Sequence, residues 1–234
     1  MKQGRLYGVG VGPGDPELMT LKAVRIIREC QVIAIPHREK EKCTAYQIAR
    51  QAVPEIEEKN CLFLPMPMTK DREILEKSHR EAADKLAERL KAGEQVAFLT
   101  LGDATIYSTY LYVHERIRKM GFEAEIVNGV PSFCAAAARL GGPLVNGAEE
   151  LHVIPASYQI EEALALPGVK VLMKAGRQMG SVKELLVKRG LEARMVENCG
   201  MAGERVFGSL EEIPEQAGYY SLILAADRAE EGKR

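Results

Sequence analysis

Three short segments rich in small residues are the parts of this sequence best suited to hold a ligand against the main chain. They are residues 8–17, 101–107 and 128–134. Glycine and alanine let a bulky ligand approach the backbone closely. Each segment follows a short apolar run, so we expect each at the carboxyl end of a strand, where α/β sheets bind their ligands.

The first segment lacks both common phosphate-binding motifs. The dinucleotide fingerprint Gly-x-Gly-x-x-Gly fails in either register, because Pro13 and Asp15 stand where its last glycine belongs. No Gly-Lys-Ser/Thr follows, and the next apolar run ends in Pro36-His37 without an acidic residue for a ribose. A nucleotide-dependent oxidoreductase is therefore disfavoured. Asp15 and Pro16 instead suit the N-cap and first position of a helix.

Each loop alone also fits an ordinary structural role. The first fits a strand-to-helix turn, and Asp103 or Thr105 would suit as a cap for the helix after the second loop. Three such loops in this order at strand ends make a more specific pattern. A non-catalytic binding module remains the alternative if their combination is coincidental.

The amino-acid composition and the net charge disfavour several classes of protein. The 234 residues are 46% hydrophobic and 28% charged, with a formal net charge of −1. This is a globular composition without the basic field of a general nucleic-acid binder. No apolar run is long enough to span a bilayer and no signal-peptide pattern opens the chain, so we expect a cytoplasmic protein. The spacing of the five cysteines and four histidines predicts neither a disulfide framework nor a protein-bound metal.

Strand and helix patterns alternate along most of the chain, which predicts α/β architecture with a parallel sheet covered on both faces. We expect two α/β domains, residues 1–122 and 123–234. The last two strands should be antiparallel neighbours, because the turn between them is too short for a helical crossover. Expected strands are 6–11, 31–35, 61–64, 96–101, 125–127, 151–154, 169–173, 193–197, 204–210 and 219–225; expected helices are 16–30, 44–53, 71–92, 106–121, 131–140 and 182–189.

The three loops resemble motifs of the tetrapyrrole (corrin and porphyrin) methylases. Residues 11–18 resemble the opening signature of that family, Leu101-Gly102-Asp103 is similar to its Gly-Gly-Asp methyl-donor loop, and residues 129–132 match the position of a Pro-Gly-Val/Ile turn. The likeness covers essentially the whole chain, with one departure at Asn128, where the family usually has proline. It implies a two-domain α/β fold that holds S-adenosylmethionine in the cleft between the domains.

Within the family, residues 67–71, 101–109 and 130–137 most resemble members that methylate carbon 20 of precorrin-2. The resemblance thus implies a C-methyltransferase of cobalamin biosynthesis that acts as a homodimer, and residues 105–120 offer apolar surface for a partner. The residues leave open whether the substrate ring carries cobalt. The other family activities remain alternatives: another corrin-ring carbon, uroporphyrinogen, diphthine synthesis, or a ribosomal RNA ribose, which the near-neutral charge disfavours.

Methyl transfer from a sulfonium needs positioning and exclusion of water, and no protein nucleophile. Proton loss from the methylated carbon can need a base, for which Asp103 and Tyr107 are the candidates. We expect Ala104 to face the donor, so that a tryptophan there would block the site while the fold survives. By resemblance, the donor contacts are Leu101, Gly102, Asp103, Ile106, Pro131, Ser132, Ala156, Ser157, Met173, Lys174, Asn198, Leu224 and Ala225.

The substrate implied by the family carries many carboxylates, so a chain of net charge −1 must gather cations locally. The cations that follow expected strands are therefore candidates, although each also fits an ordinary solvated surface charge. The substrate-binding candidates are the first-loop residues Gly12, Pro13, Gly14 and Asp15 and the cations His37, Arg38, Lys40, Lys70, Arg72 and Arg177.

Overall fold

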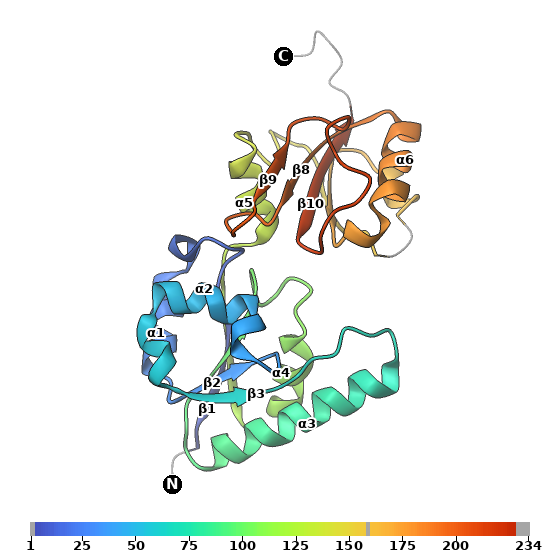
Figure 1. Ribbon diagram of the computed structural model, residues 1–234. Helices are drawn as coiled ribbons and strands as arrows, with labels where there is room; N and C mark the ends of the chain where they lie inside the picture. The colour runs from blue at the N-terminus through green and yellow to red at the C-terminus, as the bar shows by residue number, and fades with distance from the viewer. Residues whose placement is uncertain (1–2, 158–159, 228–234) are drawn as a thin grey trace. The chain divides into compact units, whose positions relative to one another are not determined.

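The computed structural model describes residues 3–157 and 160–227, apart from the side chain of Arg177. The chain forms two compact units, Met1–Pro131 and Ser132–Arg234 (Figure 1). Each unit is built around its own five-stranded sheet. Two α/β units confirm the expected fold class. In the part of the chain that the structure describes, no helix is both long and apolar enough to cross a membrane.

The sheet of the first unit is parallel throughout, with strand order β3-β2-β4-β1-β5. Because all five strands run in the same direction, their carboxyl ends meet at one edge of the sheet. The loops that follow β1, β4 and β5 therefore leave neighbouring strands at that edge. The strands are β1 (Arg5–Gly10), β2 (Val32–Ile35), β3 (Asn60–Phe63), β4 (Val96–Thr100) and β5 (Glu123–Val127).

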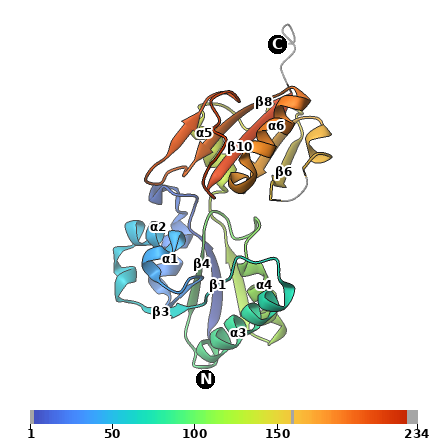
Figure 2. The ribbon, with the colours of Figure 1, turned by 45° about the vertical axis from the view of Figure 1, so that its right-hand side comes forward.

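Helices cover both faces of this sheet, as the alternation predicted (Figures 1 and 2). On one face, α1 (Leu21–Glu29) and α2 (Thr44–Ala52) pack against alternate strand residues such as Ile33 and Leu99. On the other face, α3 (Arg72–Lys91) and α4 (Tyr110–Lys119) pack against the intervening residues, among them Phe98. Side chains of a strand alternate between its two faces, so both cores draw on the same strands.

Two helices of the first unit begin later than the apolar periodicity predicts. Residues Pro16–Leu18 form only a short 3-10 turn, capped by Asp15. The α-helix α1 starts at Leu21, because Thr20 caps it by accepting a hydrogen bond from the amide of Ala23 at 3.1 Å. Residues 106–109 are loop, and α4 starts at Tyr110.

The sheet of the second unit is mixed, with strand order β6-β7-β10-β8-β9. Only β6 and β7 pair in parallel; the other pairs are antiparallel. Helices α5 (Ser132–Arg139) and α6 (Met179–Arg189) lie on opposite faces (Figure 2). The strands are β6 (Leu151–Pro155), β7 (Val169–Met173), β8 (Leu191–Glu197), β9 (Arg205–Phe207) and β10 (Ser221–Asp227).

The expectation that the last two strands are neighbours is wrong. β8 lies between β9 and β10 and pairs with both. Burial explains the order: the first five residues of β10 are buried, whereas β9 is a short strand with two exposed residues. The buried strand takes the centre of the sheet, and the short strand, which is largely exposed, takes an edge.

The division of the chain falls after the third loop, between Pro131 and Ser132. The sequence placed it between residues 122 and 123. The difference arises from β5, which pairs with β1 along five residues and so belongs to the first sheet. All three small-residue loops up to Pro131 are therefore part of the first unit.

Candidate functional site

The loops after β1 and β4 are joined through their main chains. The amide of Gly102 donates to the carbonyl oxygen of Gly12 at 2.8 Å, and the amide of Gly12 donates back to the carbonyl oxygen of Gly102 at 3.2 Å. Gly12 has a φ of +79° and Gly102 a φ of +69°, values that glycine adopts without steric cost. Two glycines thus form a short antiparallel bridge across neighbouring strand ends.

The carboxylate of Asp103 joins the loops after β4 and β5. Its Oδ1 atom accepts hydrogen bonds from the amide of Thr105, at 2.7 Å, and from the Thr105 hydroxyl. Its Oδ2 atom accepts from the amide of Gly129 at 2.9 Å and from the side-chain amide of Asn128 at 3.1 Å. Only 5% of Asp103 is exposed. Four donors therefore fix one buried carboxylate at the meeting point of the loops.

These contacts set the charge of Asp103. Burial acts to raise its pKa, but the hydrogen bonds from Thr105, Asn128 and Gly129 outweigh burial and lower the pKa below its ordinary value. The carboxylate is therefore ionised at neutral pH. Asp103 does not cap the next helix, contrary to the simple structural interpretation of the sequence. At the start of α4, the amide of Tyr110 donates instead to the hydroxyl of Ser108 at 3.2 Å.

Gly10 and Gly129 are small because the three loops touch one another. A Cβ atom on Gly129 would lie 2.2 Å from the carbonyl oxygen of Gly102 and 2.8 Å from the carbonyl carbon of Gly10. A Cβ on Gly10 would lie 2.7 Å from that same Gly102 oxygen. Small residues in these loops predict room for a ligand near the backbone. At Gly10 and Gly129 the room is taken by neighbouring backbone, and we call this contact of three loops the loop junction.

Three described residues other than glycine have a positive φ: Tyr107 at 48°, Lys174 at 62° and Asn198 at 52°. All three are among the candidate site residues predicted from the sequence. A left-handed conformation costs a residue with a side chain about 1 kcal/mol, and such strain concentrates at functional sites. Tyr107 lies in the loop after β4 with 49% of its surface exposed. Its backbone conformation also explains why the helix expected from Ile106 does not begin there.

Ala104 does not occupy the position that the sequence assigned to it. It is fully buried among apolar side chains of the core formed with α3 and α4, including Phe98 and Val113. A tryptophan at this position would overpack that core, which is destabilising. The expectation that Ala104→Trp would block a ligand while leaving the fold intact is therefore wrong.

The remaining donor candidates near the end of the first unit lie close in sequence to the residues of the loop junction. Leu101 is half-buried against the core formed with α1 and α2. The amide of Ile106 donates to the carbonyl oxygen of Asp103 at 3.3 Å, which closes the turn of the second loop. Pro131 ends the first unit, and Ser132 begins α5 of the second.

Five of the candidate cations lie in the segments that follow β2 and β3, two strands whose carboxyl ends are at the sheet edge that carries the loop junction. His37 and Arg38 come directly after β2, and Lys40 opens a 3-10 turn with its ammonium 5.7 Å from the ring centroid of Tyr46. Lys70 and Arg72 flank the N-cap of α3 after β3. The sequence grouped these cations by their place after strands, and the parallel topology brings those strand ends to one edge. The sixth candidate, Arg177, lies in the second unit, and its side chain is outside the described structure.

Several second-unit candidates gather at one end of that unit's sheet. The amide of Ala156, just before Ser157, donates to the carbonyl oxygen of Met173 at 2.7 Å. Lys174 and Asn198 directly follow β7 and β8, which end on the same side of the sheet. Burial lowers the pKa of the Lys174 ammonium.

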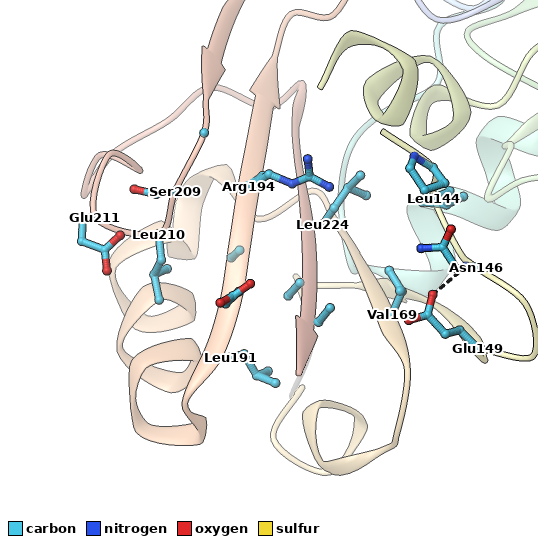
Figure 3. A pocket seen from close by; sticks show the side chains of 16 residues that line it. Leu144, Asn146, Glu149, Val169, Leu191, Arg194, Ser209, Leu210, Glu211 and Leu224 are labelled. Atoms are coloured by element: carbon cyan, nitrogen blue, oxygen red, sulfur yellow. Dashed lines mark hydrogen bonds between the residues drawn. The ribbon is translucent and has the colours of Figure 1, made fainter. Parts of the chain in front are cut away.

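Leu224 and Ala225 lie elsewhere on the second sheet. They pair with Val171 and Lys170, three or four residues along β10 from Ser221. At about 3.4 Å per residue, they lie about 10 Å or more from that end of the strand. Leu224 and Ala225 instead line a cavity of about 840 Å³, whose lining residues all belong to the second unit (Figure 3). Figure 3 shows Arg194 and Leu224 on its strands and Leu144 and Asn146 on the loop before β6.

Four of the cysteines are poorly suited to act as nucleophiles. Burial raises the pKa of the Cys30 thiol to about 12 and raises the pKa values of Cys43, Cys61 and Cys134 above their ordinary value. A raised pKa disfavours the thiolate, which is the reactive form. Among the residues described, no three His, Cys, Asp or Glu side chains are placed to hold a metal ion.

Sequence reasoning did not assign a role to Asn128 or Thr20. The Thr20 hydroxyl donates to the carbonyl oxygen of Asn128 at 3.2 Å, so the cap of α1 also holds the third loop. The available signal was the replacement of a usual family proline by an asparagine, a residue with a side-chain donor.

The region that carries the three loops is similar in sequence to a known protein family. A model of the family "Tetrapyrrole (Corrin/Porphyrin) Methylases" matches residues 5–214, which include all three loops. The chain belongs to this family. The match agrees with the resemblance carried by the loop motifs.

Individual members of the family resemble the chain over nearly its whole length. A probable cobalt-precorrin-2 C(20)-methyltransferase of Methanocaldococcus jannaschii is 36% identical over 224 residues, 94% of this chain and 95% of the relative. The cobalt-precorrin-2 C(20)-methyltransferase of Salmonella typhimurium is 34% identical over 229 residues, with 94% and 95% covered. A Thermus thermophilus uroporphyrin-III C-methyl transferase complexed with S-adenyl homocysteine has the same fold, with a TM-score of 0.71, 22% identity and 95% and 97% covered.

Proposed function

We propose that this protein is an S-adenosylmethionine-dependent methyltransferase that methylates carbon 20 of precorrin-2 or cobalt-precorrin-2. The observation that carries the proposal is the loop junction, with an ionised Asp103 fixed at the carboxyl edge of a parallel sheet. Support for the donor comes from the Thermus thermophilus structure with the demethylated product. Support for the carbon atom comes from the names of two relatives that are 36% and 34% identical over about 94% of the chain.

The reaction needs a donor held in line with the acceptor carbon, with water excluded. S-adenosylmethionine supplies an activated methyl group on a positively charged sulfonium. Asp103 is a fixed negative charge in a buried setting, where it attracts a cationic ligand more strongly than it would in water. The donor contacts proposed by resemblance in the second unit, such as Lys174 and Asn198, are side chains or backbone groups at strand ends.

Asp103 is better suited to positioning than to proton transfer. Both of its oxygen atoms already accept hydrogen bonds, and its pKa is lowered. A general base works best when its pKa lies near the working pH. We therefore assign Asp103 to ligand positioning and retain Tyr107, half-exposed in the same loop, as the candidate for the proton-accepting group.

The test of the proposed function is transfer of label from S-adenosyl[methyl-³H]methionine to precorrin-2 and to its cobalt complex, assayed in parallel with uroporphyrinogen III. Product analysis by mass and NMR identifies the methylated carbon. Label at carbon 20 in either corrin precursor supports the proposal, and the ratio of the two rates identifies the natural form of the ring. Label only in uroporphyrinogen, or at another ring carbon, contradicts the assignment.

We expect the cations in the segments that follow β2 and β3 to bind substrate carboxylates. Arg72→Gln should raise the substrate KM about tenfold, because a charge-assisted hydrogen bond to a carboxylate contributes about 1.5–3 kcal/mol. Donor affinity should hardly change. Steady-state kinetics with both substrates separate the two effects.

Lys91→Gln is the matched control for Arg72→Gln. Both residues are exposed and sit at opposite ends of the 20-residue helix α3. At 1.5 Å per residue these ends are about 29 Å apart. Equal effects of the two substitutions would show that general surface charge, and not a carboxylate site at Arg72, governs substrate binding.

We also propose that the protein is a homodimer through residues 105–120, as the resemblance implies. In this segment Tyr107, Tyr112 and Met120 are 49%, 59% and 45% exposed, which leaves apolar surface for a partner. Light scattering should give twice the 25.8 kDa of one chain. Tyr112→Glu should shift the mass to that of a monomer, whereas Val187→Glu, at an exposed position of α6, should not. A parent protein that is monomeric at micromolar concentration contradicts this proposal.

A further inference from the structure

Asn128 is held on two sides at the end of β5. Its side-chain amide donates to Oδ2 of Asp103 at 3.1 Å, and its carbonyl oxygen accepts from the hydroxyl of Thr20 at 3.2 Å. The next residue, Gly129, donates its main-chain amide to the same Asp103 oxygen at 2.9 Å. Asn128 therefore connects the cap of α1, the third loop and the carboxylate of the second loop.

The usual family residue at this position could make only part of these contacts. Proline restricts the backbone through its ring, but it has neither an amide hydrogen nor a side-chain donor. Asparagine leaves the backbone less restricted and adds two side-chain N–H donors. In this chain one of those donors points at a carboxylate that is 5% exposed. In this chain, the hydrogen bond from Asn128 to Asp103 therefore takes the place of the backbone restriction that a proline ring would impose.

We infer that Asn128 is a positioning residue that holds the Asp103 carboxylate in the orientation required for donor binding. The inference rests on the proposed function, because it takes the donor to bind at the loop junction. It goes beyond that function by assigning a role to a residue that the family motif does not supply. Asn128 acts through Asp103 and is not assigned any contact with the reacting atoms.

The groups around Asp103 predict how loss of the Asn128 side chain should change the pH dependence of donor binding. Its hydrogen-bond donors are Thr105, Asn128 and Gly129, and none of them titrates near neutral pH. The other ionisable groups in the three loop segments are Asp15 and Glu17 in the first, Tyr107 in the second and Cys134 in the third. Asp15 accepts from the amide of Glu17 at 2.9 Å. Removal of the Asn128 amide takes away one of the contacts that lower the pKa of Asp103. Donor binding should then fail at a higher pH than in the parent.

The experiment is calorimetric titration of the chain with S-adenosylhomocysteine between about pH 2.5 and pH 8, a range that extends below the ordinary carboxyl pKa because the pKa of Asp103 is lowered. The variants are Asn128→Ala, which removes the amide, and Asn128→Pro, which supplies the usual family residue without a side-chain donor. Asn60→Ala, at an exposed site where β3 begins, is the control for the same substitution elsewhere. Asn128 is itself exposed, so truncation opens no core cavity, and thermal melts verify that each variant folds.

We expect Asn128→Ala to weaken binding about three- to tenfold at pH 7 and to move the acid limb of the binding curve upward by up to about one pH unit. Asn128→Pro should show the same acid-limb shift even where its melting temperature matches the parent. Asn60→Ala should bind like the parent at every pH.

Each other outcome counts against the inference. Parent-like affinity and acid limb in Asn128→Ala would show that the amide does not position Asp103. Restoration of the parent curve by Asn128→Pro would show that backbone restriction, not the hydrogen bond, is what the site needs. A parent protein that does not bind S-adenosylhomocysteine at any pH contradicts the proposed function and the inference with it, whereas a binding parent with unaffected variants contradicts the inference alone.

Discussion

Gly129→Ala should lower the free energy of unfolding by about 3 kcal/mol and weaken binding of S-adenosylhomocysteine more than tenfold. The added Cβ would lie 2.2 Å from the carbonyl oxygen of Gly102 and 2.8 Å from the carbonyl carbon of Gly10. These neighbours are backbone atoms at the ends of β4 and β1, so no rotamer change can relieve the contact. The loops must separate, which pulls the Gly129 amide away from Asp103.

Gly142→Ala is the matched control for this prediction. A Cβ there would meet a guanidinium nitrogen of Arg194 at 3.6 Å, which is ordinary van der Waals contact with a flexible side chain. It should change stability by less than about 0.5 kcal/mol, as do most surface substitutions. Urea unfolding of the two variants and the parent, followed by calorimetry on the folded fractions, provides the comparison. Equal stability of Gly129→Ala and the parent would contradict the close packing of the loop junction.

The sequence predicts the elements of this fold well where one local pattern decides the outcome. The strand expected over 169–173 has the same bounds in the structure, as β7 (Val169–Met173). The alternation of strands and helices likewise predicts a covered parallel sheet, because a chain that returns after each helix must run its strands in one direction. Asp15 and Pro16 predict the start of a helical turn, and Asp15 caps one.

Contacts between distant parts of the chain were beyond the reach of these patterns. Asp103 and Asn128 are 25 residues apart, and the pairing of β1 with both β4 and β5 brings them together. The order of β10, β8 and β9 depends on competition for the buried centre of the sheet, which short-range periodicity does not record. Ala104 shows a third limit: a small residue beside a glycine fits ligand contact as well as core packing, and here it is core.

Asp103→Asn should be the most damaging conservative substitution at the loop junction for donor binding. The carboxylate accepts four hydrogen bonds, two on each oxygen. An asparagine keeps one acceptor oxygen and turns an NH₂ group toward two donors, so two N–H or O–H groups lose their partner. We expect a loss of about 2–3 kcal/mol of stability and a loss of donor affinity of about 30- to 100-fold.

The pH dependence of the stability loss distinguishes this prediction from a general packing defect. The pKa of Asp103 is lowered in the folded protein, so its contribution to stability is fully present above its unfolded pKa of about 3.9 and disappears as the pH falls through the folded pKa. The stability difference between parent and Asp103→Asn should therefore be largest at neutral pH and shrink below about pH 4. Other carboxylates titrate in both proteins and cancel in the difference.

Asp71→Asn is the control, because Asp71 caps α3 in the same unit by accepting from the amides of Glu73 at 2.9 Å and Ile74 at 3.2 Å. It should cost no more than about 1 kcal/mol, since asparagine is itself a good N-cap, and should leave donor affinity unchanged. Urea unfolding at a series of pH values and titration with S-adenosylhomocysteine measure both quantities. A stability difference for Asp103→Asn that stays constant down to pH 3 would show that Asp103 is not held ionised by the loop junction. Parent-like donor affinity in the folded variant would place the donor away from Asp103.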